Sequence, residues 1–281
     1  MRVSFLGTGD AGGVPLYGCD CVACLRARAD ATYRRRNCSA LIETRTTRIL
    51  LDAGLTDLTD RFPPGSLSAI LVTHFHPDHV QGLLHLRWGR GAPIPVFAPP
   101  DSEGCADLYK NHGLLQFQAL AKFEAVNVGD LCITPLPLIH SRPTFGYAIE
   151  DPLGARFAYL TDTAGLPPRT ESFLQAWQPD GMAIDCSHPP REQAPRNHND
   201  FGRALDCLNT AGIGAKGGAK GGAKGGAESG AESGAGWLTH LGHDFDQWEM
   251  GNPVKLPAGV CIARDGETVD LRGRLNKGAA Q

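Results

Sequence analysis

The sequence contains no run of about 18 apolar residues, the length that a helix needs to cross a membrane. It also lacks an excess of either charge, since 27 basic and 30 acidic side chains give a formal net charge of −3. A protein that binds nucleic acid through a basic surface normally carries a clear positive excess. These absences exclude a membrane span and a strongly basic binding surface. We therefore expect neither membrane nor nucleic acid among the partners.

The cysteines and the start of the chain indicate the compartment. Nine cysteines, an odd number, are scattered over 281 residues, which argues against a disulfide framework. The first seven residues, MRVSFLG, have the pattern of a strand and reach glycine too early for a secretory signal. We expect a reducing, cytoplasmic environment.

Short apolar runs rich in β-branched residues recur between turn residues. They predict strands at 3–6, 40–42, 49–51, 69–72, 93–97, 131–138, 146–149, 156–160, 182–185, 260–263 and 268–271. Helical patterns lie between them at 22–29, 79–86, 101–109, 171–177 and 200–208. This alternation indicates an α/β fold in which helices cover a sheet, most simply as one domain over residues 1–281.

One segment, 214–236, fits neither pattern. It holds ten of the 35 glycines, and its only apolar side chains before Trp237 are alanines. Such a stretch cannot bury enough apolar surface to offset the entropy lost on ordering. We predict a flexible, low-complexity insertion in the domain.

The most distinctive motif is THFHPDH at 73–79, directly after a predicted strand. His74 and His76 are two positions apart and can point at one centre, and the turn that follows lets Asp78 and His79 reach a second point nearby. Imidazole and carboxylate groups together suit zinc, manganese or iron. A lone histidine is usually a surface or core residue, but four ligand-type side chains this close predict a metal site.

Three further ligand-type side chains, His140, Asp162 and His240, each follow an apolar strand-like run. Together with the motif at 73–79 they supply five histidines and two aspartates, which is enough for two metals. Asp162 is the natural bridging group, because its two carboxylate oxygens can span a short metal–metal distance.

A second cluster consists of Cys19, Cys21 and Cys24. Three thiols in six residues can bind one soft ion, and a fourth ligand would complete a tetrahedral structural zinc site. His243, three residues after His240, is our candidate for the fourth ligand. A redox pair formed by Cys21 and Cys24, or a disulfide, is the alternative.

The metal motifs resemble those of the metallo-β-lactamase superfamily. The matching pieces, in the family's order, are LDAG at 51–54, the motif at 73–79, His140, Asp162 and His240. The resemblance implies a four-layer αβ/βα sandwich with the metals at one edge of the sheets. It implies one metal bound by His74, His76 and His140, another bound by Asp78, His79 and His240, and Asp162 shared between them. Asp52 would orient the histidine loop from outside the metal shell.

The cysteine cluster narrows this resemblance. With CSHPPR at 186–191, PRNH at 195–198, TFGY at 144–147 and LTDTAGLP at 160–167, it is similar to the phosphodiesterases of the bacterial carbon–phosphorus lyase system. That family opens 5-phosphoribosyl 1,2-cyclic phosphate to ribose 1,5-bisphosphate in phosphonate catabolism. The similarity implies two divalent metal ions at the active site, manganese or zinc, one structural zinc, a small-molecule phosphate ester as substrate, and a homodimer.

Within this resemblance, His198 and Asp78 are the candidate catalytic residues. His198 lies outside the metal set, and a histidine can give a proton near pH 7 to the sugar oxygen that leaves. His188, Arg191 and Arg196 could receive the second phosphate of the substrate, because the planar fork of arginine suits phosphate oxygens.

Three alternatives remain. An RNA 3′-end processing nuclease usually carries a long basic arm, and nothing in this sequence is comparably basic. A lactamase or thiolester hydrolase would explain the metal motif but neither the cysteine cluster nor the segment 186–191. A non-catalytic metal-binding protein of pyrroloquinoline quinone synthesis shares the cysteine cluster, but its metal motif is typically altered, whereas here the ligands are intact.

Overall fold

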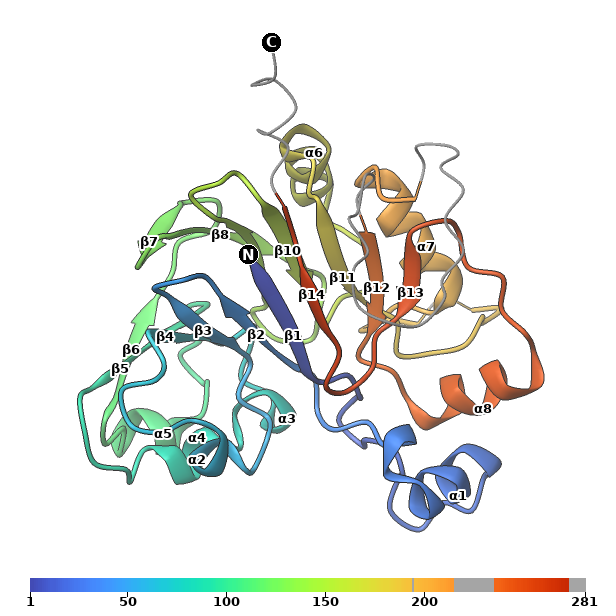
Figure 1. Cartoon of the computed structure of the whole chain (residues 1–281), viewed down its shortest axis with the longest axis horizontal. Coiled ribbons are helices and arrows are strands. Elements are labelled where there is room, and N and C mark those ends of the chain that lie inside the picture. Colours follow the sequence, from blue (N-terminus) through green and yellow to red (C-terminus); the bar gives the residue numbers. More distant parts are fainter. Residues whose placement is uncertain (194, 215–234, 273–281) are drawn as a thin grey trace.

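The computed structural model describes residues 1–193, 195–214 and 235–272. In this part of the chain two seven-stranded mixed sheets pack face to face, and helices cover the outer face of each sheet (Figure 1). This arrangement confirms the predicted α/β fold with a four-layer αβ/βα sandwich. The predicted insertion falls largely outside the described residues.

The first sheet contains the first six strands and the last, in the order β14-β1-β2-β3-β4-β5-β6. Its strands are β1 (Arg2–Gly7), β2 (Ser39–Glu43), β3 (Arg48–Leu51), β4 (Ala69–Leu71), β5 (Ile94–Ala98), β6 (Leu115–Ala119) and β14 (Thr268–Asp270). Strands β3 to β6 run parallel, so their carboxyl ends meet at one edge. The helices α2 (Leu58–Arg61), α3 (Pro77–Val80), α4 (Leu83–Leu86) and α5 (Ala106–Lys110) pack on the outer face.

The second sheet has the order β13-β12-β11-β10-β9-β8-β7. Its strands are β7 (Val126–Val128), β8 (Leu131–Pro137), β9 (Phe145–Glu150), β10 (Arg156–Leu160), β11 (Gly181–Asp185), β12 (Ala235–Thr239) and β13 (Val260–Ile262). Strands β10 to β13 are parallel. The helices α6 (Pro168–Trp177), α7 (Phe201–Thr210) and α8 (His243–Gly251) cover this sheet, and α1 (Val22–Ala29) lies against α8.

The central core lies between the two sheets. On β9, Phe145 and Tyr147 face this core, while Ala148 belongs to the core beneath the outer helices. Trp237 of β12 packs on Phe5 of β1, with the ring centroids 5.8 Å apart. Side chains alternate between the two faces of a strand, so strands covered on both faces need apolar residues at nearly every position. This requirement explains the continuous apolar runs in the sequence.

Several elements differ from those that the sequence predicts. The helix expected at 79–86 is two short helices, α3 and α4, separated at Gly82, where a Cβ atom would lie 2.2 Å from the carbonyl oxygen of Leu55. The short strands β6 and β7 and the helix α8 were not predicted. Residues 215–234 of the low-complexity segment lie outside the described residues, but β12 forms fully and pairs with β11 and β13. The strand that precedes His240 is therefore intact.

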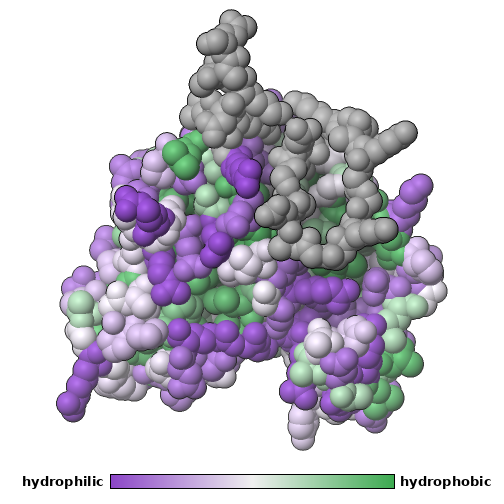
Figure 2. Space-filling model, viewed as in Figure 1, coloured by the Kyte–Doolittle hydropathy of each residue, from purple (hydrophilic) through white to green (hydrophobic). Residues whose placement is uncertain are grey.

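Apolar side chains also reach the surface on the lobe that carries α1. Tyr17, Val22 and Leu25 are exposed there, and Figure 2 shows apolar surface on this lobe at the lower right. The nine cysteines are all free thiols, so the cysteines near α1 form no disulfide. Within the described residues, no helix combines the length and apolarity of a membrane-crossing segment.

Candidate metal centre

The predicted metal ligands gather at one edge of the sandwich, between the two sheets. The segment 73–79 follows β4 in the first sheet. In the second sheet His140 lies between β8 and β9, Asp162 follows β10, and His240 follows β12. Parallel strands present their carboxyl ends at a common edge, which is where α/β proteins usually bind ligands. The topology therefore brings together side chains that are far apart in the sequence.

Four of these residues form a first donor group: His74, His76, His140 and Asp162. Nδ1 of His76 lies 2.8 Å from Nε2 of His74 and 3.1 Å from Nε2 of His140. Asp162 Oδ2 is 3.7 Å from the His74 nitrogen and 3.8 Å from the His140 nitrogen. The three ring nitrogens and the carboxylate thus converge on one small volume, and they could hold one metal ion.

A second donor group consists of Asp78, His79, His240 and again Asp162. Nε2 of His79 lies 3.1 Å from Asp78 Oδ2 and 3.4 Å from Asp162 Oδ2. Nε2 of His240 lies 3.2 Å from the other oxygen of Asp162, Oδ1. Oδ2 of Asp162 thus faces His74 and His140 of the first group, while Oδ1 faces His240 of the second, an arrangement that lets one carboxylate serve both groups.

The outer nitrogens of His79, His240 and His140 are each held by a polar contact. Nδ1 of His79 lies 2.8 Å from Asp52 Oδ2, and Asp52 also accepts the backbone N–H of Thr73. Nδ1 of His240 lies 2.9 Å from the hydroxyl of Ser187, and Nδ1 of His140 lies 2.9 Å from the carbonyl oxygen of Asn197. Such contacts set the tautomer and hold the second nitrogen toward a metal.

The inner atoms fit a metal rather than one another. Nε2 of His79, Nε2 of His240 and Oδ1 of Asp162 are buried, yet among the described residues they have no hydrogen-bond partner. Their short contacts with each other lack hydrogen-bond geometry. Buried polar atoms without partners are costly, and a bound cation satisfies them together. Imidazole and carboxylate groups in this number suit zinc or manganese.

The charge states of the rings also suit metal binding. Burial lowers the pKa of His74, His76 and His140, so these rings are neutral and can donate a lone pair. Burial also acts to lower the pKa of His79 and His240, but Asp162 together with the neighbouring carboxylates, Asp52 for His79 and Asp78 and Asp185 for His240, outweighs it and raises both values. The raised pKa values favour protonated rings at His79 and His240. A metal ion bound there would take the place of these protons and of their positive charge.

Two of these residues have an unusual backbone conformation. Asp52 has a φ of 57° and His240 a φ of 59°, both in the left-handed region that non-glycine residues rarely adopt. Each residue directly follows the end of a strand. The left-handed turn directs the side chain into the cluster instead of along the sheet, and such strain concentrates at functional sites.

His198 stands beside the metal donors, and its main partner is a residue that the sequence did not suggest. Nδ1 of His198 lies 2.8 Å from Oδ2 of the fully buried Asp185, and its ring stacks on His240 at 5.1 Å. Burial acts to lower the pKa of His198, but the carboxylate of Asp185 outweighs it and raises the value. Asp185 is the last residue of a predicted strand, as Asp162 closely follows another. This position at a strand end is the signal by which the sequence could have indicated Asp185 as a site residue.

The three predicted substrate-binding residues do not form one cluster. His188 and Arg191 both contact the carboxylate of Asp244, with His188 Nδ1 at 3.5 Å. This pairing lowers the pKa of Asp244 against the effect of its burial. Arg196 is exposed and has no polar partner within the described part of the chain. The His188 ring lies 6.2 Å from that of His198, so this segment borders the metal centre.

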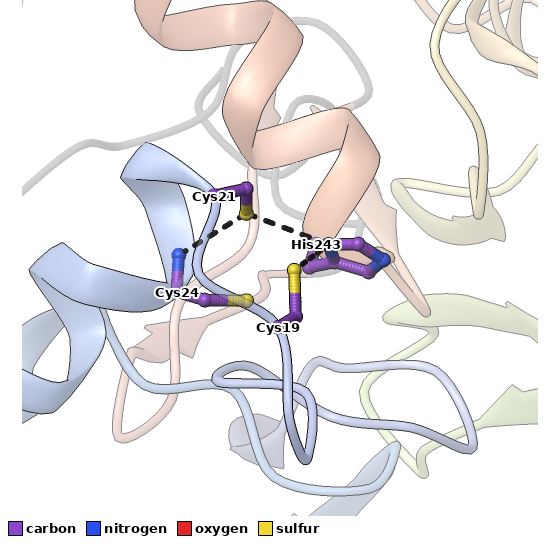
Figure 3. A group of neighbouring side chains, drawn as sticks. All are labelled: Cys19, Cys21, Cys24 and His243. Carbon is purple, nitrogen blue, oxygen red and sulfur yellow. Dashed lines mark hydrogen bonds between the residues drawn. The ribbon is translucent and has the colours of Figure 1, made fainter.

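The cysteine cluster forms a separate donor group with His243. Figure 3 shows the side chains of Cys19, Cys21, Cys24 and His243 turned toward one another from the loop before α1, from α1 itself and from the start of α8. Sγ of Cys19 and Sγ of Cys21 each lie 3.5 Å from Nδ1 of His243. Three thiols and an imidazole within 4.8 Å of one another have the composition of a structural zinc site.

The fold and the two adjacent donor groups define the class of metal-dependent hydrolases built on paired αβ layers. The chain belongs to the β-lactamase superfamily, because the profile of the Beta-lactamase superfamily domain matches residues 47–216. This match covers the motif at 73–79, His140 and Asp162.

Similar proteins differ in their activities. An octanoyltransferase of Porphyromonas gingivalis is 28% identical over 239 residues, which cover 75% of this chain and 44% of that protein. A ribonuclease Z of Methanosarcina acetivorans is 30% identical over 186 residues, covering 60% of this chain and 55% of the ribonuclease. The chain thus spans about half the length of these curated relatives. A diphosphatase of the PhnP family has the same fold, with a TM-score of 0.72 and 23% identity over 96% of this chain and 97% of the diphosphatase.

Proposed function

We propose that the chain is a dinuclear-metal phosphodiesterase that opens 5-phosphoribosyl 1,2-cyclic phosphate to ribose 1,5-bisphosphate in phosphonate catabolism. The observation that carries this proposal is the pair of donor groups that share Asp162. Among the similar proteins, a diphosphatase and a ribonuclease both act on bonds between phosphorus and oxygen, which supports chemistry of this kind.

The donor groups would hold two divalent ions, manganese or zinc. His74, His76 and His140 would bind one ion, Asp78, His79 and His240 the other, and Asp162 both. Two such ions, when bound, would supply a water nucleophile at neutral pH and neutralise the phosphate oxygens. Cys19, Cys21, Cys24 and His243 would bind a structural zinc.

The residues of the chain supply the proton. Asp185 holds His198 at Nδ1, so Nε2 of the protonated ring can give its proton to the sugar oxygen that leaves. The attacking water loses one proton to solvent as its oxygen forms a bond to phosphorus, the bond between phosphorus and the sugar oxygen breaks, and the sugar oxygen takes the proton from Nε2. Asp185 then stabilises the neutral ring in the tautomer with its proton on Nδ1.

The surroundings of the site support a small substrate and a dimer. The segment of His188, Arg191 and Arg196 borders His198, so it lies within reach of a small substrate held at the metal donors. The exposed apolar lobe of Tyr17, Val22 and Leu25 supports a homodimer, because apolar patches of this kind commonly mark protein contacts. We place the protein in the cytoplasm, where free thiols persist.

Hydrolysis of bis-p-nitrophenyl phosphate, a β-lactam and a thiolester, each with added manganese or zinc, separates the alternatives. We expect turnover of the phosphodiester only, and its loss on chelation. The cyclic ribose phosphate should then be hydrolysed with a higher kcat/KM than the model ester. Turnover of the β-lactam or thiolester alone would identify another hydrolase of the superfamily, and absence of all three activities under every metal would favour a non-catalytic metal-binding protein.

Replacing His198 with alanine tests the proposed proton donor. We expect kcat for the cyclic ribose phosphate to fall about 10²- to 10⁴-fold, the usual contribution of a general acid. Metal content should stay at the wild-type level, because His198 lies outside both donor groups that share the seven predicted ligands. His85→Ala, an exposed histidine on α4, is the matched control and should keep full activity. Unchanged turnover in His198→Ala would remove His198 from the mechanism.

A further inference from the structure

A large pocket lies beside the metal centre and has no role in the function proposed above. Its volume is about 750 Å³, enough for a small phosphorylated molecule. Its walls come from four segments: 99–100 after β5, 120–124 after β6, 137–145 between β8 and β9, and Arg169 in the first turn of α6. Each of these segments is nine residues long or shorter, so the pocket arises from segments that are distant in the sequence.

The pocket shares two loops with the metal centre. The turn between β8 and β9 lines the pocket with Leu138 and Arg142 and carries His140 between them. The segment that follows Asp162 leads directly into α6 and Arg169. Nη1 of Arg142 donates to the carbonyl oxygen of Phe75, inside the histidine motif, at 3.0 Å. The pocket and the candidate metal centre are therefore built in part from the same turn.

Two cations at the pocket are available for an anion. Arg169 lies over the ring of Phe123, at 4.2 Å from its centroid, which holds the guanidinium in place by a cation–π contact. Within the described residues, the side chains of Arg169 and Lys122 form neither a hydrogen bond nor an ion pair. Glu124 also lines the pocket and offsets one of these charges. By contrast, Arg142 is already paired with Asp101, at 3.4 Å.

The helix α6 adds to the positive potential. It has ten residues and begins at Pro168, so Arg169 stands in its first turn, the end of a helix that carries the positive end of the dipole. The hydroxyl of Thr170 donates to the carbonyl oxygen of Pro137 at 2.7 Å, which fixes this turn against the end of β8. The N-terminus of a helix beside two unpaired cations favours a dianion such as a phosphate.

The remaining walls are apolar. Pro99, Pro100, Leu138 and Phe145 line the pocket and offer no charged group. They would contact the carbon skeleton of a ligand, while Arg169 and Lys122 contact its anionic end. This division of polar and apolar walls is typical of small-molecule sites.

We propose that this pocket binds a phosphate monoester group of the substrate through Arg169 and Lys122, while the scissile phosphate lies at the metal donors. The proposal rests on the proposed function. It places the second phosphate at a different point from the segment 186–198, where His188 and Arg191 face the carboxylate of Asp244 and their charge is partly compensated.

The test uses ribose 5-phosphate as a competitor of bis-p-nitrophenyl phosphate on the metal-loaded enzyme. In the double variant Lys122→Gln with Arg169→Gln, we expect the inhibition constant of ribose 5-phosphate to rise about tenfold or more, because two charge-assisted contacts are lost. Unphosphorylated ribose should inhibit weakly in every variant. Arg45→Gln, an exposed arginine in the turn between β2 and β3, is the matched control and should bind ribose 5-phosphate as the wild type does.

Two outcomes would overturn the subsite. An unchanged inhibition constant in the double variant would mean that the phosphate binds at the metals alone. A rise in Arg196→Gln without a rise in the double variant would place the phosphate in the segment 186–198. Calorimetric titration with ribose 5-phosphate needs no turnover, so it separates the two proposals: binding that depends on Arg169 and Lys122 in a protein without phosphodiesterase activity would refute the proposed function but retain the subsite.

Discussion

Replacing Asp162 with asparagine is expected to lower kcat for phosphodiester hydrolysis by about 10³-fold or more. Oδ2 of Asp162 faces His74 of the first donor group and Oδ1 faces His240 of the second, so a single carboxylate serves both donor groups. Burial acts to raise the pKa of Asp162, but the positive charges of His240 and His79 outweigh it and lower the value, which keeps this carboxylate ionised. Asparagine keeps one oxygen but removes the charge that two cations share. A loss of several kcal/mol in transition-state stabilisation corresponds to a factor of this size.

The same variant should lose metal. Measurement of metal content after dialysis should give fewer active-site ions per chain than the wild type, while the structural zinc stays bound. Asp206→Asn changes an exposed carboxylate on α7 and is the matched control, with unchanged kcat and metal content. An Asp162→Asn protein that keeps both ions and turns over within about twofold of the wild type would show that Asp162 does not bridge them.

Replacing Cys21 and Cys24 together with serine is expected to give the largest loss of stability. The thiols lie against His243, the first residue of α8, and thereby join α1 to the second sheet. Binding of a structural metal contributes folding free energy directly. A cost of about 3 kcal/mol would lower Tm by roughly 6–12 °C in a chain of this size. Activity should fall as well, because His240 lies three residues before His243.

The measurement pairs thermal unfolding with zinc content. Cys132→Ser removes an exposed thiol on β8 and is the control, with Tm and zinc content near those of the wild type. The redox alternative makes a different prediction. If Cys21 and Cys24 were a redox pair, the wild type would contain no third metal ion, and its Tm would depend on the reducing agent instead of on zinc.

The convergence of the candidate metal ligands could be predicted from the sequence because their positions follow from strand ends. His140, Asp162 and His240 each follow an apolar run, and parallel strands bring such ends to one edge. The same rule applies to Asp185, which ends β11 between β10 and β12. Because Asp185 is itself the last residue of the apolar run, the sequence assigns it to the strand and not to the site. Only the structure shows the contact between Asp185 and His198.

Other features could not be predicted because they depend on contacts between distant segments. The pairing of His188 and Arg191 with Asp244 joins the loop after β11 to the first turn of α8, about fifty residues later in the sequence. The pocket beside Arg169 combines four segments, none of which carries a motif. The strand β6 alternates glutamine with apolar residues at the sheet edge, and its pairing with β5 decides its conformation.

The position of the ligands on both sheets has a consequence for the lifetime of the protein. The segment 73–79 belongs to the first sheet, while His140, Asp162 and His240 belong to the second. Apart from apolar packing, this edge is joined by hydrogen bonds such as that from the backbone N–H of Phe145 to the carbonyl oxygen of Thr73, at 2.9 Å. Ions bound here would stabilise the folded chain by an amount that grows with the logarithm of free metal concentration. A cell short of manganese or zinc would then hold a larger unfolded fraction, and proteolysis would reduce the amount of enzyme in step with the metal supply.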